Sequence, residues 1–89
     1  MKKKIAIFVR DRKHESLRMA VGATLCNDDV NVFVMNDTLE SDEEIDVNLQ
    51  MLSDLNVHIY SNNPQNPFEQ KTTEEIARMI SEYDIVIPY

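Results

Sequence analysis

The chain has 89 residues, of which 43% are hydrophobic and only one is glycine, and this composition is typical of a single packed globular domain over residues 1–89. Its formal net charge of −7 argues against a nucleic-acid partner, because phosphate binding needs an electropositive surface. The longest apolar run near the N-terminus, Ile5 to Val9, is much shorter than a secretory or membrane-spanning segment, so we expect a cytoplasmic protein without membrane contact.

Apolar runs and amphipathic segments alternate along the chain. Four runs rich in β-branched and aromatic residues are predicted as strands: KKIAIFV (3–9), VNVFVM (30–35), VHIY (57–60) and DIVIPY (84–89). Three segments with apolar residues at helical spacing are predicted as helices: HESLRMAVGATLC (14–26), SDEEIDVNLQMLSDL (41–55) and TTEEIARMISEY (72–83). This order predicts right-handed βαβ units and a mainly parallel four-stranded sheet with helices on its faces.

Each predicted helix has an apolar stripe that should face the sheet. Ser41 with Glu44, and Thr72 with Glu75, match the capping-box pattern that begins a helix, because each side chain satisfies a backbone donor of the other residue. The residues expected on the buried stripes are Leu17, Ala20, Val21, Thr24 and Leu25, then Ile45, Leu49 and Leu52, and finally Ile76, Met79, Ile80 and Tyr83.

Several functions common among α/β domains are excluded by residues that the chain lacks. Its only glycine, Gly22, lies inside the first predicted helix, so neither a dinucleotide-binding loop nor a P-loop is present. A single cysteine, Cys26, excludes an internal disulfide and a multi-cysteine metal site, and His14 and His58 have no ligand at metal-binding spacing. We therefore expect neither a metal nor a cofactor.

The positive charge gathers at the start of the chain. Seven of the nine basic residues fall in the first 18 positions, giving +5 there, whereas residues 19–89 carry −12. This distribution predicts a local basic surface on an acidic protein, although the same charges can equally serve to keep strand ends and helix faces hydrated.

The first helix has a second apolar face. Between Met19 and Cys26 no residue is charged, and Met19, Ala23 and Cys26 lie together on this face. In so small a domain we expect another copy of the chain to cover it, and the alternative is a modestly exposed apolar helix.

The runs KIAIFV, SLRMAVGATL, VNVFVMNDTL and EYDIVIPY, in this order, resemble the DsrE/DsrF-like family of small bacterial proteins, which are related to sulfur-relay subunits. The resemblance implies a three-layer α/β/α fold and homo-oligomers, often trimers or hexamers. In the family's sulfur-transferring members a cysteine in the loop after the third strand carries a persulfide. The matching loop here, SNNPQNPFEQKTT, contains no cysteine. Because this departure from the family pattern removes the residue that would carry the persulfide, we do not expect catalysis at this loop.

Cys26 is the one residue of this chain that offers a thiol for sulfur chemistry. It lies near the end of a helix and close to Asp28 and Asp29, and both features disfavour a thiolate. We therefore expect Cys26 to be a core or interface residue.

Ligands of parallel α/β sheets bind beyond the carboxyl ends of the strands. There we expect a binding surface for a small anionic ligand or a protein partner, formed by Arg10, Arg12, Lys13, Ser61, Asn62, Asn63, Gln65 and Phe68.

The preferred interpretation is a DsrE-like accessory or binding protein without sulfurtransferase activity of its own. The alternative is an active sulfur carrier or sulfurtransferase subunit that uses Cys26 or a partner's cysteine. The loop after the third strand has a third reading, as a shaped connector, because Asn-Pro pairs at Asn63 and Asn66 favour rigid turns.

Overall fold

The computed structural model describes residues 3–10, 13–25, 29–35 and 42–88. The elements in chain order are β1 (Lys4–Val9), α1 (Lys13–Leu25), β2 (Asp29–Val34), α2 (Glu43–Asp54), β3 (Ile59–Ser61), β4 (Glu69–Gln70), α3 (Thr73–Ile80) and β5 (Ile85–Pro88). Every predicted helix and strand is present, with ends shifted by one or a few residues. No helix in the described part of the chain has the length and apolar character needed to cross a bilayer.

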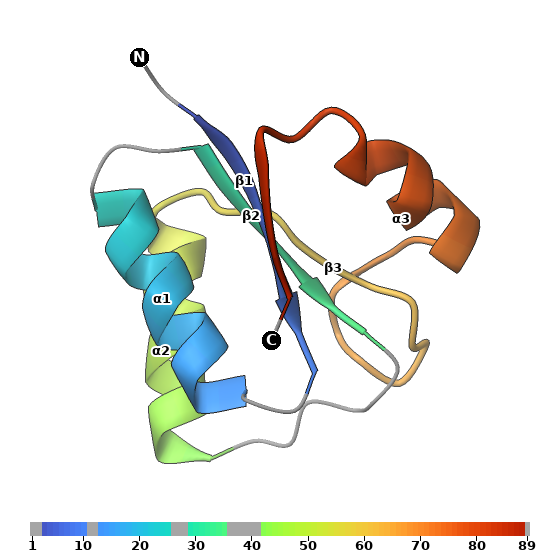
Figure 1. Ribbon diagram of the computed structural model, residues 1–89. Coiled ribbons are helices and arrows are strands. Elements are labelled where there is room, and N and C mark those ends of the chain that lie inside the picture. Colours follow the sequence, from blue (N-terminus) through green and yellow to red (C-terminus); the bar gives the residue numbers. More distant parts are fainter. Residues whose placement is uncertain (1–2, 11–12, 26–28, 36–41, 89) are drawn as a thin grey trace.

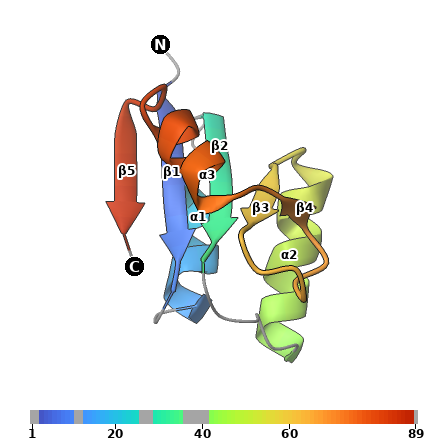
Figure 2. The same cartoon turned by 90° about the vertical axis from the view of Figure 1, so that its right-hand side faces the viewer.

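The strands form one sheet in the order β4-β3-β2-β1-β5, and every neighbouring pair is parallel (Figure 2). The predicted parallel α/β fold is confirmed, but the predicted number of four strands is wrong. The additional strand, β4, consists of two polar residues within the loop after β3, and it pairs Glu69 with Tyr60 and Gln70 with Ser61. Two polar residues carry no apolar alternation, so only the folding back of the loop reveals this strand.

The two faces of the sheet bury separate sets of side chains, because successive residues of a strand point to opposite faces. On one face Ile5, Ile7 and Val9 of β1 pack in a cluster with residues of α1 and α2. On the other, Ala6 and Phe8 belong to the cluster that contains residues of α3. Figure 1 shows α1 and α2 side by side on one side of the sheet and α3 on the opposite side.

An aromatic group fills the space under α3. The ring of Phe33, fully buried near the carboxyl end of β2, stacks on Tyr60 with centroids 5.2 Å apart and meets Tyr83 edge-on at 5.8 Å. The Tyr83 hydroxyl accepts a hydrogen bond of 2.7 Å from the side-chain amide of Asn31. Of the four residues predicted on the buried stripe of the third helix, Ile76 is fully buried. The other three, Met79, Ile80 and Tyr83, are half-buried.

The apolar stripe of α1 is confirmed except at its end. Leu17, Ala20 and Val21 are buried and Thr24 is half-buried, but Leu25, the last residue of the helix, is 65% exposed. On the second apolar face Met19 is 38% exposed and Ala23 is partly buried against the core, while Cys26 lies outside the described residues.

The helix starts agree with the sequence pattern at α3 and differ at α2. Thr72 and Glu75 form the predicted capping box of α3. At α2 the predicted box of Ser41 with Glu44 is wrong, since the N-cap is Asp42, whose carboxylate accepts a hydrogen bond of 2.8 Å from the Ile45 amide. An aspartate at the N-cap serves the same exposed donors as a serine, so the local pattern allowed either start.

Candidate functional site

The loop between β3 and α3 is held from inside by the hydroxyl of Ser61. This residue is fully buried, and its Oγ accepts hydrogen bonds from the Asn63 backbone amide at 3.0 Å and from the Asn66 side-chain amide at 2.9 Å. Asn66 is itself buried. A buried hydroxyl that satisfies two donors of its own loop fixes the path of the chain at the end of β3.

The far end of the loop is tied back to the same residues. The side-chain amide nitrogen of Gln70 lies 3.0 Å from the carbonyl oxygens of both Asn63 and Asn66 and donates to them. The backbone amide of Lys71 donates to the Ser61 carbonyl at 3.0 Å, which continues the pairing of β4 with β3. The loop is therefore a closed hydrogen-bonded frame, and its shape is set before any ligand arrives.

A shallow, open pocket of about 200 Å³ lies where this frame meets the start of α3. Its lining residues all carry polar side chains: Asn62, Gln70, Lys71, Thr72 and Glu75. The side-chain amide of Asn62 donates to the Thr73 hydroxyl at 3.1 Å, so one wall of the pocket is attached to the helix.

Among the described residues that line the pocket, one side chain is positive and one is negative. Lys71 is partly buried, and its Nζ lies 3.7 Å from a carboxylate oxygen of Glu69. The pKa of Glu75 is held below its usual value chiefly by the hydrogen bond from the Thr72 backbone amide. A hydrogen bond with the Thr72 side chain lowers it further. Glu75 is therefore ionised at neutral pH, and a ligand meets charges of both signs.

The predicted loop residues take different places around this pocket. Asn62 lines it, whereas Ser61 is buried and Asn63 belongs to the frame. The backbone amide of Gln65 donates to the side-chain oxygen of Asn63 at 2.9 Å within a turn of the frame. Phe68 turns away from the polar side and packs, half-buried, against the cluster beneath α1 and α2.

The two predicted basic residues that the structure describes, Arg10 and Lys13, do not line the pocket. Arg10 is exposed at the end of β1, Lys13 is the first residue of α1, and Arg12 lies outside the described residues. The reason is the strand order, since β2 separates β1 from β3 and two strand spacings amount to about 10 Å. The sequence placed the basic residues after β1 and the loop residues after β3 at the same carboxyl edge of the sheet. The distance between these two sets depends on the order of the strands.

Four of the five pocket residues were not among the predicted ones. Gln70, Lys71, Thr72 and Glu75 lie at the end of the loop and the start of α3. The capping box of Thr72 with Glu75 was the available signal, because it fixes where the loop ends and the helix begins.

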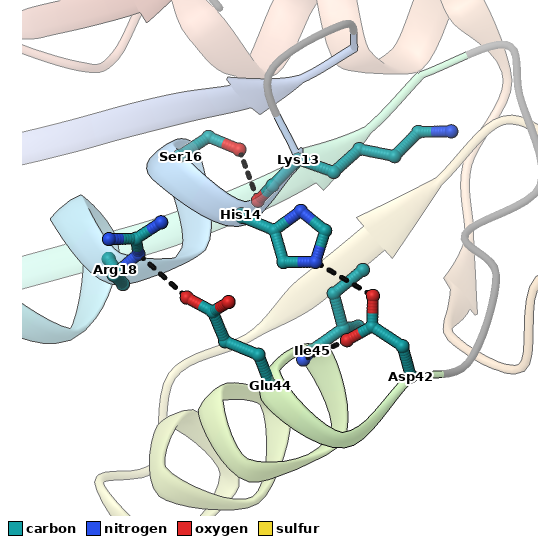
Figure 3. A network of polar contacts seen from close by, with 7 residues as sticks. All are labelled: Lys13, His14, Ser16, Arg18, Asp42, Glu44 and Ile45. Atoms are coloured by element: carbon teal, nitrogen blue, oxygen red, sulfur yellow. Dashed lines mark hydrogen bonds and ion pairs between the residues drawn. The ribbon is translucent and has the colours of Figure 1, made fainter.

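A second polar cluster joins the starts of α1 and α2 (Figure 3). His14 Nε2 lies 2.7 Å from a carboxylate oxygen of Asp42, and Arg18 Nε lies 2.9 Å from Glu44 Oε1. The hydrogen bond from the Ile45 amide is the main cause that lowers the pKa of Asp42, and His14 adds to it. Both contacts are solvent-exposed, so each adds little to stability, and together they connect the start of α2 to the first turns of α1.

Among the described residues, no hydrogen bond joins His14 to a hydroxyl or thiol that could act as a nucleophile. The described hydroxyl nearest to His14 in sequence, that of Ser16, is buried and donates to the Lys13 carbonyl at 3.0 Å. Among the described residues no three histidine, cysteine or carboxylate side chains gather where a metal ion would bind. What the described residues show of this cluster is a contact between α1 and the start of α2.

No family model, curated protein or solved structure matches this chain. The resemblance to the DsrE/DsrF-like proteins remains a prediction from the sequence.

Proposed function

We propose that this chain is a non-enzymatic binding subunit, an accessory protein of the DsrE/DsrF-like type with the three-layer α/β/α arrangement of that family. The observation that carries the proposal is the pocket at the start of α3, which a closed hydrogen-bonded loop frames in advance. A site that is already ordered binds without the cost of ordering its own side chains. The cytoplasmic location expected from the sequence belongs to the same proposal.

The chemistry of the loop supports binding rather than catalysis. At the place where sulfur-transferring relatives carry a cysteine, this chain has a loop whose first hydroxyl, that of Ser61, is buried and already hydrogen-bonded. A nucleophile needs an exposed reacting atom and a base beside it, and Ser61 has neither.

The charges of the pocket indicate the class of ligand. A bare anion is attracted by Lys71 but repelled by Glu75. A small molecule that carries both an anionic group and a hydrogen-bond donor or cation is attracted by both residues. Asn62 and Gln70 add side-chain amide groups, and at Gln70 it is the oxygen that can accept from a ligand, because its nitrogen already donates to loop carbonyls. The ligand that fits is thus small, polar and zwitterionic or mixed in charge.

We would test this by following backbone amide resonances during titration with glycine as the zwitterionic probe and inorganic phosphate as the bare anion. Glycine should perturb residues around Asn62, Gln70 and Lys71, and Lys71→Ala should abolish the effect. Arg78→Ala is the matched control, because it removes an equal charge from an exposed position of α3 that does not line the pocket. Equal responses of the two variants, or no saturable response to either probe, would contradict the proposed site.

A second measurement tests the absence of sulfur transfer. Incubation with a persulfide donor followed by intact-mass analysis should show no added sulfur on the native chain. A gain of one sulfur atom that Cys26→Ser abolishes would overturn the non-enzymatic proposal.

A further inference from the structure

The two edges of the sheet are protected to different degrees. β4, at one edge, has two residues, one of them Glu69, with Lys71 directly after it, and short length and charge are the usual protection of an open edge. β5, at the other edge, has four residues and no charge, and Ile85 and Val86 are 37% and 38% exposed. Figure 2 shows β5 beside β1 with no described element on its outer side.

The exposed side chains of β5 point to both faces of the sheet. Ile85 and Ile87 lie beside Ile5 and Ile7 on the face of α1 and α2, whereas Val86 lies beside Ala6 on the face of α3. A docked helix covers one face only. A strand added to the edge brings side chains to both faces, so the surface fits a strand.

The hydrogen-bond pattern of β1 shows which backbone groups of β5 face outward. The carbonyl oxygens of Lys3 and Val9 accept from amides at the two ends of β2, so the odd-numbered residues of β1 point to β2 and Ala6 points to β5. Ala6 is opposite Val86, and in a parallel ladder it bonds to the residues on either side of Val86. The N–H and C=O of Val86 itself therefore face the open edge.

Pro88 restricts what can pair there. It is the next residue of β5 whose backbone faces outward, and it has no N–H to donate. A long partner strand would place a backbone carbonyl opposite Pro88, where no N–H is available to donate to it. A short strand centred on Val86 would not.

We propose that a second copy of this chain occupies this edge, with β5 antiparallel to β5 and a two-fold axis at Val86. Val86 of each copy then exchanges two hydrogen bonds with Val86 of the other, and Ile85 of each lies opposite Ile87 of the other. β5 is itself a short strand, apolar on both faces, with its outward donor at Val86, so the surface is self-complementary as a two-fold interface requires.

The charges at the two ends of β5 favour the antiparallel arrangement. Glu82 and Asp84 precede β5, while Arg10 is exposed just after the end of β1 beside it. The antiparallel arrangement places Arg10 of one copy near the acidic pair of the other, whereas parallel strands would set Asp84 against Asp84. Opposite charges at the rim matter here because two chains of net charge −7 otherwise repel each other.

This inference goes beyond the proposed binding function and relies on none of the pocket residues. It also differs from the expectation of a trimer or hexamer in which the face of Met19, Ala23 and Cys26 on the first helix forms the contact between copies. The test therefore has to separate the two surfaces.

Single cysteines in a Cys26→Ser background distinguish them. Val86→Cys should give a disulfide-linked dimer under mild oxidation, because the Cα atoms of a hydrogen-bonded antiparallel pair lie about 5.5 Å apart, within disulfide range. Ile85→Cys and Met19→Cys should stay largely monomeric, since neither residue faces its own copy in this dimer. Cross-linking at Met19 in place of Val86 would overturn the proposal.

Sedimentation equilibrium of the native chain provides the second test. We expect a reversible dimer at micromolar concentration, and Val86→Pro should shift it to the monomer because it removes the outward N–H while leaving the bonds to β1. Val86→Ala, which keeps this N–H, is the control and should dimerise more tightly than the proline variant. A monomeric native chain, or a dimer that Val86→Pro leaves unchanged, would refute the proposal, whatever the titrations at Lys71 show.

Discussion

Asn48 is the residue whose environment agrees least with its chemistry. It is buried on the face of α2 that also buries Ile45 and Leu52, and its side-chain nitrogen has no hydrogen-bond partner in the described part of the chain. A buried polar group left without a partner costs about 1 to 3 kcal/mol. The sequence showed Asn48 only as a polar position one residue before Leu49, so its burial was not predicted.

We expect Asn48→Leu to raise the free energy of unfolding by about 1 kcal/mol, because leucine has nearly the same shape and no donor to desolvate. Urea unfolding of the two proteins measures the difference. Asn48→Asp is the control and should be less stable than the native chain, since it buries a carboxylate. A leucine variant less stable than the native chain would show that the amide oxygen contributes more than the nitrogen costs.

Ser61 shows how the same residue type allows opposite roles. From the sequence its hydroxyl belonged to the binding surface, but in the structure it is buried and serves the loop. Nothing in the run SNNPQNPF distinguishes an exposed hydroxyl from a buried one. The difference depends on how the chain folds back from Gln70 towards Asn63.

At the scale of elements, α3 depends strongly on its first turn. It has eight residues, which is too short for a helix to be stable without caps or packing. Thr72 and Glu75 satisfy each other's backbone amides at 3.1 Å in both directions, and Ile76 anchors the helix in the core. The same two residues line the pocket, so the cap and the candidate site share their geometry.

Thr72→Ala should lower the free energy of unfolding by about 1 kcal/mol, because it removes the hydroxyl that accepts from the Glu75 amide. The pKa of Glu75 should rise towards its usual value, since the Thr72 hydroxyl is one of the groups that lower it. Chemical denaturation and carboxyl resonances followed against pH measure the two effects. Thr72→Ser keeps the hydroxyl and should behave like the native chain, and a serine variant as unstable as alanine would contradict this account.

At the scale of the whole molecule, acid stability depends on carboxylates that cap helices. Asp42 at α2 and Glu75 at α3 both have pKa values below their ordinary values of 3.8 and 4.5, chiefly because backbone amides donate to them. A lowered pKa means that the folded state favours the ionised form. Their contribution is therefore complete above the unfolded pKa and is lost as the pH falls through the folded pKa.

We expect the free energy of unfolding to fall steadily as the pH decreases from about 5 to below 3.8. The double variant Asp42→Asn with Glu75→Gln should show a shallower decline over this window, because both caps then keep an oxygen acceptor without a titrating charge. Unfolding by urea at a series of pH values measures both curves. Parallel curves would indicate that other carboxylates control acid unfolding.

Much of the architecture follows from the sequence alone. The β-branched runs, the helical spacing of apolar residues and the alternation of the two predict a parallel α/β fold, because these patterns reflect burial on one or two faces of each element. The capping box of Thr72 with Glu75 is similarly local, and it is present as predicted. Loop positions at the carboxyl edge of the sheet follow from the direction of the chain.

Tertiary structure decided which of these pieces meet. The order of the strands separates Arg10 and Lys13 from the loop after β3, and the fold of that loop creates β4 and turns Phe68 towards the core. It also leaves β5 at an open edge. These outcomes depend on contacts between residues far apart in the chain, whereas a sequence pattern records only the neighbours of each residue and the faces that it should bury.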